Sequence, residues 1–438
     1  MNYYNPKEIF GLENSEGFGS APKYEGSGDV RFIQNFEKFK SYYVQAHGAK
    51  KRDFTAYAKK LTDNGFRLYD SNQVRECLFS TYTDGYNIVN LSFMKYKTPV
   101  DAEGAKAGET VSYINIAVES TDSSALPPLG SDEPAITTVQ LTMLNSEPAF
   151  LIRMRDGRFI FIDGGVDGIY ERVHADLFFG QLEAQNVREG KPVVAAWIIT
   201  HPHADHIAGV MRTLQKYGDR FAVERVLCNF QSEHTIRKEL GGIMETEGPY
   251  NYGWQMNLYN GVLAKFPEIR LITVHAGQRF VFAGLTMNIL WTPENLCRPF
   301  EVGNDASVIY QLTGGEGSLL VTGDAQQINT KLTQAIWGDG VKSDLLLFAH
   351  HGYRARNVEF YAKVHAKYGI WTNSWESVLE AKENMFNNPA YNGVDPNAET
   401  KIIIPTNREP VLILSPGMPE SELEPYIHNQ EMKEYTRE

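Results

Sequence analysis

Three histidines and an aspartate stand close together in the segment THPHADHIAG, which runs from Thr200 to Gly209. They are His201, His203, Asp205 and His206, in the pattern HxHxDH. Imidazole and carboxylate groups suit Zn²⁺, and also Mn²⁺ or Fe, as ligands. Residues two apart in an extended chain face the same side, so His201 and His203 can share one cation. Asp205 and His206, at the turn that follows, point elsewhere and can hold a second cation.

Two predicted elements flank these residues and must position them. Residues 193–200 (VVAAWIIT) are apolar almost throughout, which is typical of a strand buried on both faces. Apolar residues then recur at helical spacing at Ile207, Val210, Met211 and Leu214, which predicts a helix. A tight connection between a strand and a helix holds side chains rigidly above the edge of a sheet. The sequence therefore predicts a metal site at that edge.

The rest of the chain divides by composition and periodicity. Residues 120–134 (STDSSALPPLGSDEP) are dominated by Ser, Asp, Gly and Pro, which predicts a linker. Before it, a helical pattern from Phe54 to Leu61, a hairpin signal at Asp84-Gly85 and a strand at 111–118 predict a small α+β domain. After it, strands alternate with helices, which predicts sheets covered by helices. The expected parts are a flexible arm (1–29), the small domain (30–119), the linker (120–134), a main domain (135–415) and a charged C-terminal tail (416–438).

Charge and composition restrict the setting and the partners. The chain has 42 Lys and Arg against 54 Asp and Glu, a net charge of −12, which disfavours binding to long nucleic acid. The sequence contains no run of 18 apolar residues and no secretory signal, so no membrane association is expected. Cys77, Cys228 and Cys297 are widely spaced and form no CxxC pair, which fits free thiols in a reducing cytoplasm.

The HxHxDH pattern resembles the signature of the metallo-β-lactamase superfamily of hydrolases, and four further residues extend the resemblance. Asp163, in FIDGG, resembles the aspartate that closes an early strand and supports the site. Asp324, in VTGDA, resembles the aspartate that bridges two metals. His350 and His351, in FAHHG, resemble the late histidine ligand, and the sequence leaves open which of the two it is. The resemblance covers about residues 136–414.

This resemblance implies a fold, a cofactor and a reaction. The fold would be α/β (α+β), a four-layer αββα sandwich preceded by the small α+β domain. The cofactor would be two Zn²⁺ per chain, with Mn²⁺ or Fe as alternatives. The expected ligands are His201, His203, Asp205, His206, Asp324, His350 and His351. A metal-bound hydroxide would attack the substrate, with Asp205 and Asp163 orienting it and accepting protons.

Resemblances to particular members of the superfamily imply a phosphorus-containing substrate. The segment from Asn304 to Ser307 (NDAS), followed by TGDA and HHG, resembles the metallo-β-lactamase-like domain of DNA-uptake competence proteins. Phosphorylcholine esterase is a relative with similar marks. These resemblances imply a small anionic phosphoester or phosphodiester. Asn304, Tyr353 and Arg354 are either substrate contacts or structural loop residues. His203, where flavodiiron relatives carry a glutamate, favours hydrolysis.

One departure keeps a second function open. Most two-metal relatives carry a further histidine before the bridging aspartate, where this chain reads WTPEN at 291–295. The first metal would then have His201, His203 and Asp324, with water or Asn304 completing its shell. His234 is expected on the surface, and His275 is expected in a turn, with a lesser claim as a ligand. The alternative is a non-catalytic metal- or ligand-binding member of the fold with an N-terminal interaction module. The sequence leaves open the substrate, the metal, the role of residues 30–119 and the oligomeric state.

Overall fold

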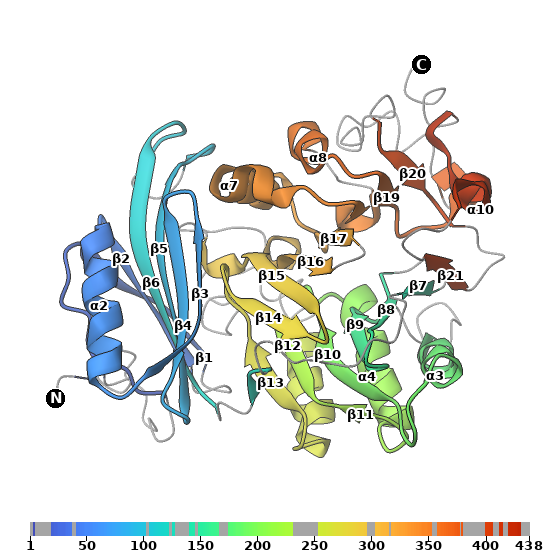
Figure 1. Cartoon of the computed structure of the whole chain (residues 1–438), viewed down its shortest axis with the longest axis horizontal. Coiled ribbons are helices and arrows are strands. Elements are labelled where there is room, and N and C mark those ends of the chain that lie inside the picture. Colours follow the sequence, from blue (N-terminus) through green and yellow to red (C-terminus); the bar gives the residue numbers. More distant parts are fainter. Residues whose placement is uncertain are drawn as a thin grey trace.

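A computed structural model of the chain contains three β-sheets and the helices that cover them (Figure 1). The residues that the structure describes are 3–4, 19–36, 41–101, 105–121, 125–127, 140–144, 148–165, 174–230, 253–295, 303–314, 317–352, 357–376, 378–379, 399–405, 411–414 and 419–430. None of the helices within these ranges combines the length and the apolar character needed to cross a bilayer.

The first sheet is formed by the N-terminal strands alone. Its strands are β1 (Asp29–Phe36), β2 (Ser41–His47), β3 (Arg67–Val74), β4 (Cys77–Thr83), β5 (Asn87–Lys97) and β6 (Thr110–Ser120). They are antiparallel and lie in the order β1-β2-β6-β5-β4-β3. The hairpin predicted at Asp84-Gly85 is confirmed, since β4 and β5 pair on either side of it and Gly85 has a φ of +101°. The strands β1, β2 and β3 were not predicted.

Helix α2 (Lys51–Asp63) covers one face of this sheet. The Asp53 carboxylate accepts a hydrogen bond from the backbone N–H of Lys50 at 2.8 Å, which helps to fix the first turn. Phe54, Tyr57 and Leu61 are buried against the sheet, so the predicted apolar face of the helix is confirmed. Figure 1 shows α2 on the outer side of the sheet, away from the rest of the molecule.

The other face of the N-terminal sheet is turned toward the rest of the molecule, and its centre is polar. The residues on this face include five polar side chains that are less than 9% exposed: Gln45, Thr81, Asn90, Asn115 and Glu119. Towards one side of the face, Phe79 stacks on Trp337 with ring centroids 5.7 Å apart. Buried polar groups need hydrogen-bond partners, so this face must meet a partner surface that provides them.

Two further sheets form the main part of the molecule. The second contains β7 (Gln140–Leu144), β8 (Phe150–Arg153), β9 (Phe159–Ile162), β10 (Val193–Ile198), β11 (Ala222–Val223), β12 (Arg225–Cys228), β13 (Arg270–Thr273) and β21 (Val411–Leu414). The third contains β14 (Arg279–Phe282), β15 (Leu285–Trp291), β16 (Ile309–Gly314), β17 (Gly317–Val321), β18 (Leu345–Leu347), β19 (Tyr368–Ile370) and β20 (Lys401–Ile403). Their orders are β13-β12-β10-β9-β8-β7-β21, with β11 beside β10, and β14-β15-β16-β17-β18-β19-β20.

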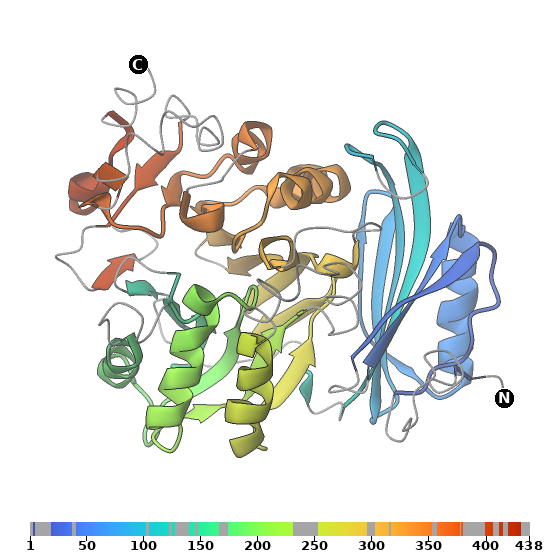
Figure 2. The same cartoon turned by 180° about the vertical axis from the view of Figure 1, so that it is seen from behind.

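These two sheets face each other, and helices cover their outer faces (Figures 1 and 2). Apolar side chains from both sheets, such as Ile162, Ile198, Ile289 and Val321, form one buried core between them. The helices that bury apolar side chains against the second sheet are α3 (His174–Ala184), α4 (Ala204–Tyr217) and the helical turns Asn257–Val262 and Leu263–Lys265. Those on the third sheet are α7 (Gln327–Trp337) and α8 (Val358–Val364). The predicted four-layer αββα arrangement is therefore confirmed.

Short helices complete the chain. They are the 3-10 turns at Pro293–Asn295, Asn304–Ala306, Gly338–Val341, Ala349–Gly352 and Glu424–Tyr426, and helix α10 (Glu420–Leu423).

Residues near both ends of the chain are packed where the structure describes them. Tyr24 and Tyr4 are buried in the α2 core, and the Tyr57 hydroxyl donates to the carbonyl of Pro22 at 2.6 Å. Near the other end, the ring of His428 stacks on Trp375 with centroids 4.0 Å apart. Aromatic side chains interspersed among charged and polar residues explain the packing near both ends, because they bury area that a purely polar segment lacks. The domain boundaries themselves stay a prediction.

Candidate metal centre

The candidate ligands lie where strands of the two main sheets end. Strands β9 and β10 are parallel, so Asp163 and His201, which follow them, come to one edge of the second sheet. Strands β17 and β18 are also parallel and bring Asp324 and His351 to the edge of the third sheet. Because the two sheets face each other, their edges meet and the side chains converge.

The tight connection from β10 to α4 depends on close backbone approach. Helix α4 begins at Ala204, with His203 as its extended N-cap residue. A Cβ atom added to Gly209 in the second turn would lie 1.8 Å from the carbonyl oxygen of Gly164. Only glycine fits at position 209, and the last residue of the THPHADHIAG segment thus seats the helix against the Asp163 loop.

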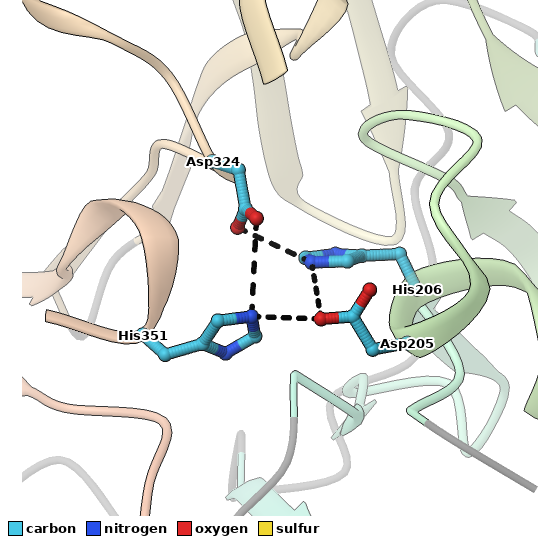
Figure 3. Close-up of side chains that lie close together, drawn as sticks. All are labelled: Asp205, His206, Asp324 and His351. Carbon is cyan, nitrogen blue, oxygen red and sulfur yellow. Dashed lines mark hydrogen bonds and ion pairs between the residues drawn. The ribbon is translucent and has the colours of Figure 1, made fainter. Parts of the chain in front are cut away.

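One ligand group contains Asp205, His206, Asp324 and His351, whose candidate ligand atoms all lie within 4.8 Å of one another (Figure 3). Nε2 of His351 is 3.0 Å from Oδ2 of Asp205. Nε2 of His206 is 3.2 Å from Oδ1 of Asp324 and 3.8 Å from Oδ2 of Asp205. Three separate segments of the chain therefore contribute to a single cluster of two imidazoles and two carboxylates.

A second ligand group contains His201, His203 and, again, Asp324. Nε2 of His201 lies 3.6 Å from Oδ2 of Asp324. The rings of His201 and His203 are 4.5 Å apart between centroids, so the two imidazoles face the same space as the HxH spacing predicts. Asp324 is thus common to both groups, and its Oδ2 lies near both His201 and His351, at 3.6 and 3.8 Å from their Nε2 atoms.

Asp163 supports the site from behind and belongs to neither group. Its Oδ2 lies 2.9 Å from Nδ1 of His206, and its two oxygens accept hydrogen bonds from the backbone N–H and the hydroxyl of Thr200 at 2.7 and 2.8 Å. Asp163 is 2% exposed. A carboxylate that holds Nδ1 of a histidine fixes the ring so that Nε2 faces the ligand space. The contacts therefore favour a positioning role for Asp163, while its predicted part in proton transfer stays a prediction.

Burial and neighbouring charges shift the pKa values of the site residues in opposite directions. Burial lowers the pKa of His201 well below its ordinary value. Burial acts on His206 in the same direction, but the carboxylates of Asp324, Asp163 and Asp205 outweigh it and raise that pKa well above the ordinary value. Burial would raise the pKa of Asp324, yet the surrounding imidazoles hold it well below the usual range. Asp324 is therefore ionised at neutral pH, the state in which a carboxylate binds metal.

Two histidine nitrogens show that these residues fit a cation. Nε2 of His201 and Nε2 of His206 are buried and have no hydrogen-bond partner among the described residues. A buried imidazole nitrogen without a partner is costly, and protein interiors rarely leave one. Cations among the ligand atoms would satisfy both nitrogens. The residues present thus fit divalent metal, although the ligand role of each predicted residue stays a prediction.

The structure distinguishes the remaining candidates. His351 is in a ligand group, whereas Nε2 of His350 is 3.9 Å from Oδ2 of Asp324 and His350 is in neither group. Asn304 is buried at 5% exposure. The backbone N–H of Asp324 donates to the Ser307 hydroxyl at 2.9 Å, so the 304–307 segment borders the site. Tyr353, Arg354, His234 and Cys297 lie outside the described residues.

Three supporting residues were missed by the sequence reasoning. They are Thr200 and Ser307, which hold Asp163 and Asp324, and Thr372, whose hydroxyl lies 3.0 Å from Nδ1 of His351. Each lies just after or just before a strand of the main sheets. The available signal was therefore position: hydroxyl side chains at strand ends on the edge that carries the histidines.

Relatives carry a further metal ligand in the stretch that corresponds to residues 291–295. In this chain that stretch contains no histidine. Glu294 occupies that stretch, and its Oε1 lies 2.9 Å from Nδ1 of His275. His275 is in a turn as expected, since its carbonyl accepts from the N–H of Gln278 at 3.1 Å, and it is buried. Neither residue is in a ligand group. Within the described part of the chain, the His201 group therefore offers three candidate ligands where the Asp205 group offers four.

Comparison with known proteins agrees with the fold and the motif. Residues 144–232 match the family model of the metallo-beta-lactamase superfamily, so this segment is similar to that superfamily. The matched segment includes Asp163 and the whole HxHxDH pattern. The two candidate ligand groups include Asp205, His206, His201 and His203 of this segment, a donor set that suits a divalent metal. No curated protein sequence matches the chain significantly.

Solved structures with a similar arrangement include a diiron protein, a Zn²⁺-bound protein and a further protein of the metallo-beta-lactamase fold. The diiron β-hydroxylase CmlA from Streptomyces venezuelae is 14% identical, with a TM-score of 0.37 over 65% of this chain and 54% of its own, so this chain spans about half its length. The metallo-beta-lactamase fold protein YhfI from Bacillus subtilis is 12% identical, with a TM-score of 0.37 over 64% of this chain and 100% of its own. Zn²⁺-bound PqqB from Methylobacterium extorquens is 14% identical, with a TM-score of 0.27 over 46% of this chain and 59% of its own. At these values the likeness says nothing of the reaction.

Proposed function

We propose that this protein is a metal-dependent hydrolase that cleaves a phosphoester or phosphodiester bond in a small anionic molecule. The observation that carries the proposal is that two ligand groups share Asp324. A carboxylate common to two ligand sets would place two cations close together, which is the arrangement of a two-metal hydrolytic centre. We propose Zn²⁺ at both positions, with Mn²⁺ or Fe as alternatives, because the ligands are imidazoles and carboxylates.

The residues of the site have separable tasks in this proposal. When bound, the cations supply Lewis-acid chemistry and lower the pKa of coordinated water from about 15.7 to about 7. Asp163 and Thr372 hold the rings of His206 and His351 by their Nδ1 atoms, which keeps both Nε2 atoms directed into the site. The Asp205 side chain is 33% exposed, against 3% for Asp324. Asp205 is therefore the carboxylate best able to pass a proton from the attacking water to solvent.

The nature of the substrate rests on the residues around the site and on the charge of the chain. Oδ1 of Asn304 is buried and has no hydrogen-bond partner among the described residues, and we assign it a contact with the substrate or with its bound water. The net charge of −12 disfavours long nucleic acid and favours a small molecule that the metals themselves can attract. A cytoplasmic setting is part of the proposal, supported by the free, buried thiols of Cys77 and Cys228.

A second function, metal or ligand binding without turnover, is favoured by one specific observation. Among the described residues, the His201 group has three candidate protein ligands, and the carboxylate of Glu294 in the neighbouring stretch already contacts His275 and Asn229. A weakly held first metal would leave the second site occupied but without a partner for catalysis.

Metal analysis combined with a substrate screen separates the two functions. The protein, loaded with Zn²⁺, Mn²⁺ or Fe²⁺, is assayed on bis(p-nitrophenyl) phosphate, p-nitrophenyl esters and a β-lactam. Two metals per chain with diesterase activity supports hydrolysis, whereas metal without turnover of any substrate supports the alternative.

A pair of aspartate variants tests the role of Asp205. We expect Asp205→Ala to lose turnover and metal while it stays folded. Asp63→Ala removes an exposed carboxylate of α2 that is paired with Lys59, and it should change neither quantity. An Asp205→Ala variant that is active and fully metallated would refute the assigned role.

A further inference from the structure

A second cluster of buried polar side chains lies on the same edge of the sandwich as the metal centre. Asn229 follows β12, His275 follows β13 and Glu294 follows β15, just as the candidate ligands follow β9, β10, β17 and β18. Neighbouring strands are about 4.8 Å apart, so these residues stand one or two strands from the ligands along that edge. With Tyr43 they form the Tyr43 cluster (Tyr43, Asn229, His275 and Glu294).

The carboxylate of Glu294 is held from two sides within this cluster. Nδ2 of Asn229 donates to its Oε2 at 2.8 Å and also to the carbonyl of Val274 at 2.7 Å. Oε1 of Glu294 lies 2.9 Å from Nδ1 of His275. Glu294 is 7% exposed, so these contacts occur away from water and are correspondingly strong. They fix the 3-10 turn at Pro293–Asn295.

Tyr43 reaches this cluster from a different sheet. It lies on β2 of the N-terminal sheet, and its hydroxyl is 2.5 Å from Nδ1 of His275 and 3.3 Å from Nδ2 of Asn229. Burial raises the pKa of Tyr43 well above its ordinary value, so the hydroxyl keeps its proton. Nδ1 of His275 carries at most one proton, which can go to only one of the two oxygens beside it. The positions of Tyr43, His275 and Glu294 are therefore coupled.

Further hydrogen bonds link the N-terminal sheet to the end of β15, on the sheet edge that carries the metal centre. Nε2 of Gln278 donates to Oδ1 of Asn90 on β5 at 2.6 Å. The N–H of Ala276 donates to the hydroxyl of Thr292 at 3.1 Å, and the N–H of Gly277 to the carbonyl of Ile289 at 2.8 Å. The turn at 275–278 thus has the N-terminal sheet on one side and the end of β15 on the other.

We propose that Tyr43 is a positioning residue of the sheet edge that carries the metal centre: through His275 and Glu294 it fixes the end of β15, which lies two strands from β17 and the Asp324 that follows it. In this arrangement the N-terminal sheet is one wall of the catalytic unit and not a separate interaction module. The inference deepens the proposed hydrolytic function and depends on it for its catalytic consequence. The structural part of the inference is that the Tyr43 hydroxyl, on the N-terminal sheet, fixes residues 289–295. This part can be measured without any turnover assay.

Hydrogen exchange of the metal-loaded full chain, read by mass spectrometry, tests that structural part. Tyr43→Phe removes the hydroxyl alone and keeps the ring that packs edge-on against His275. We expect amides of residues 275–278 and 289–295 to exchange about ten-fold faster, with the N-terminal strands unchanged. Tyr42→Phe is the matched control, because Tyr42 is the neighbouring buried tyrosine on β2 and packs in the α2 core. Unchanged exchange at 275–295 in Tyr43→Phe, or an equal change in Tyr42→Phe, overturns the proposal.

Turnover of bis(p-nitrophenyl) phosphate by the same variants tests the catalytic part. We expect Tyr43→Phe to keep the wild-type metal content and to lose about ten-fold in kcat/KM, since small misplacements near a site have effects of this order. Glu294→Gln should lose a similar amount, and the double variant should lose no more than the worse single variant, because the residues act in series. If the wild-type protein turns over nothing, the hydrolytic function fails and exchange alone decides the inference. If the wild-type protein is active and Tyr43→Phe equals it, the inference fails and the function stands.

Discussion

Two clusters of histidine and carboxylate side chains lie on one edge of the sandwich, and they differ in how their nitrogens are satisfied. In the metal centre, Nε2 of His201 and of His206 are buried without a hydrogen-bond partner among the described residues. In the Tyr43 cluster, Nδ1 of His275 has both Tyr43 and Glu294 within hydrogen-bond distance. The same residue types therefore serve two purposes. Where the protein itself completes the hydrogen bonds, a histidine joins elements, and where it does not, a cation is needed.

The same comparison distinguishes a carboxylate that is a candidate metal ligand from carboxylates that hold other side chains of the protein in place. Asp324 faces several imidazoles and is shared by both ligand groups. Glu294 and Asp163 instead have protein groups within hydrogen-bond distance of both of their oxygens. These two carboxylates therefore hold neighbouring side chains in place, whereas Asp324 belongs to both candidate ligand groups.

The largest effect is expected at the shared carboxylate. Asp324→Asn keeps the shape of the side chain and removes the charge that both ligand groups use. We expect both metals to be lost and turnover to fall by at least about 10³-fold, more than the 10–100-fold cost of losing an outer hydrogen-bond partner. Metal content by elemental analysis and initial rates measure the change. An Asp324→Asn protein that retains two metals would contradict the assignment of a shared ligand.

A smaller effect should distinguish the two ligand groups from each other. The Asp205 group offers four protein ligands and the His201 group three. We expect a chelator titration of the metal-loaded protein to remove one equivalent well before the other, and His203→Ala to abolish only the easily removed equivalent. Two equivalents that leave together, or loss of the tightly held one in His203→Ala, would show that the groups do not differ in this way.

The pH dependence of stability should report on the buried face between the sheets. Burial raises the pKa of Glu119 from an ordinary 4.5 to about 8, although Thr273 donates to it from β13. A raised folded-state pKa means that stability is fully present below about pH 4.5 and is lost as the pH rises toward 8. The loss is at most about 5 kcal/mol, from about 1.36 kcal/mol per pKa unit.

Glu119→Gln gives the matching measurement for that prediction. The amide cannot ionise, so the free energy of unfolding in urea should fall less between pH 5 and pH 8 in the variant than in the wild-type protein. The difference between the two proteins cancels the contribution of other titrating groups. Parallel curves would mean that Glu119 keeps an ordinary pKa.

The smallest effect is expected at the rim of the same interface. Arg279 pairs with Asp70 across the sheets at 2.6 Å, and its side chain is 37% exposed. Arg279→Met keeps most of the apolar stem, and exposed ion pairs contribute less than about 1 kcal/mol. We expect a correspondingly small change in the free energy of unfolding and no change in exchange at 289–295. If Arg279→Met accelerates hydrogen exchange at 289–295 as much as Tyr43→Phe does, the Arg279–Asp70 pair and not the Tyr43 cluster positions these residues.

The sequence alone determined the parts of this protein that depend on local pattern. The near-continuous apolar run at 193–200 became a buried strand, the period of Ile207 to Leu214 became α4, and Asp84-Gly85 became a hairpin. The HxHxDH spacing was sufficient to predict that His201 and His203 face one space. These features follow from interactions between residues close in the chain, whose geometry the spacing itself fixes.

Only the tertiary structure decided which distant groups meet. Nothing in the sequence separates His350 from His351, and only the packing of the strand ends brings His351 to Asp205 and leaves His350 outside the ligand groups. Nor does any local pattern link Tyr43 to His275, which are 232 residues apart. Such contacts depend on how three sheets pack against one another, and that packing is set by the whole buried surface and not by the residues that it brings together.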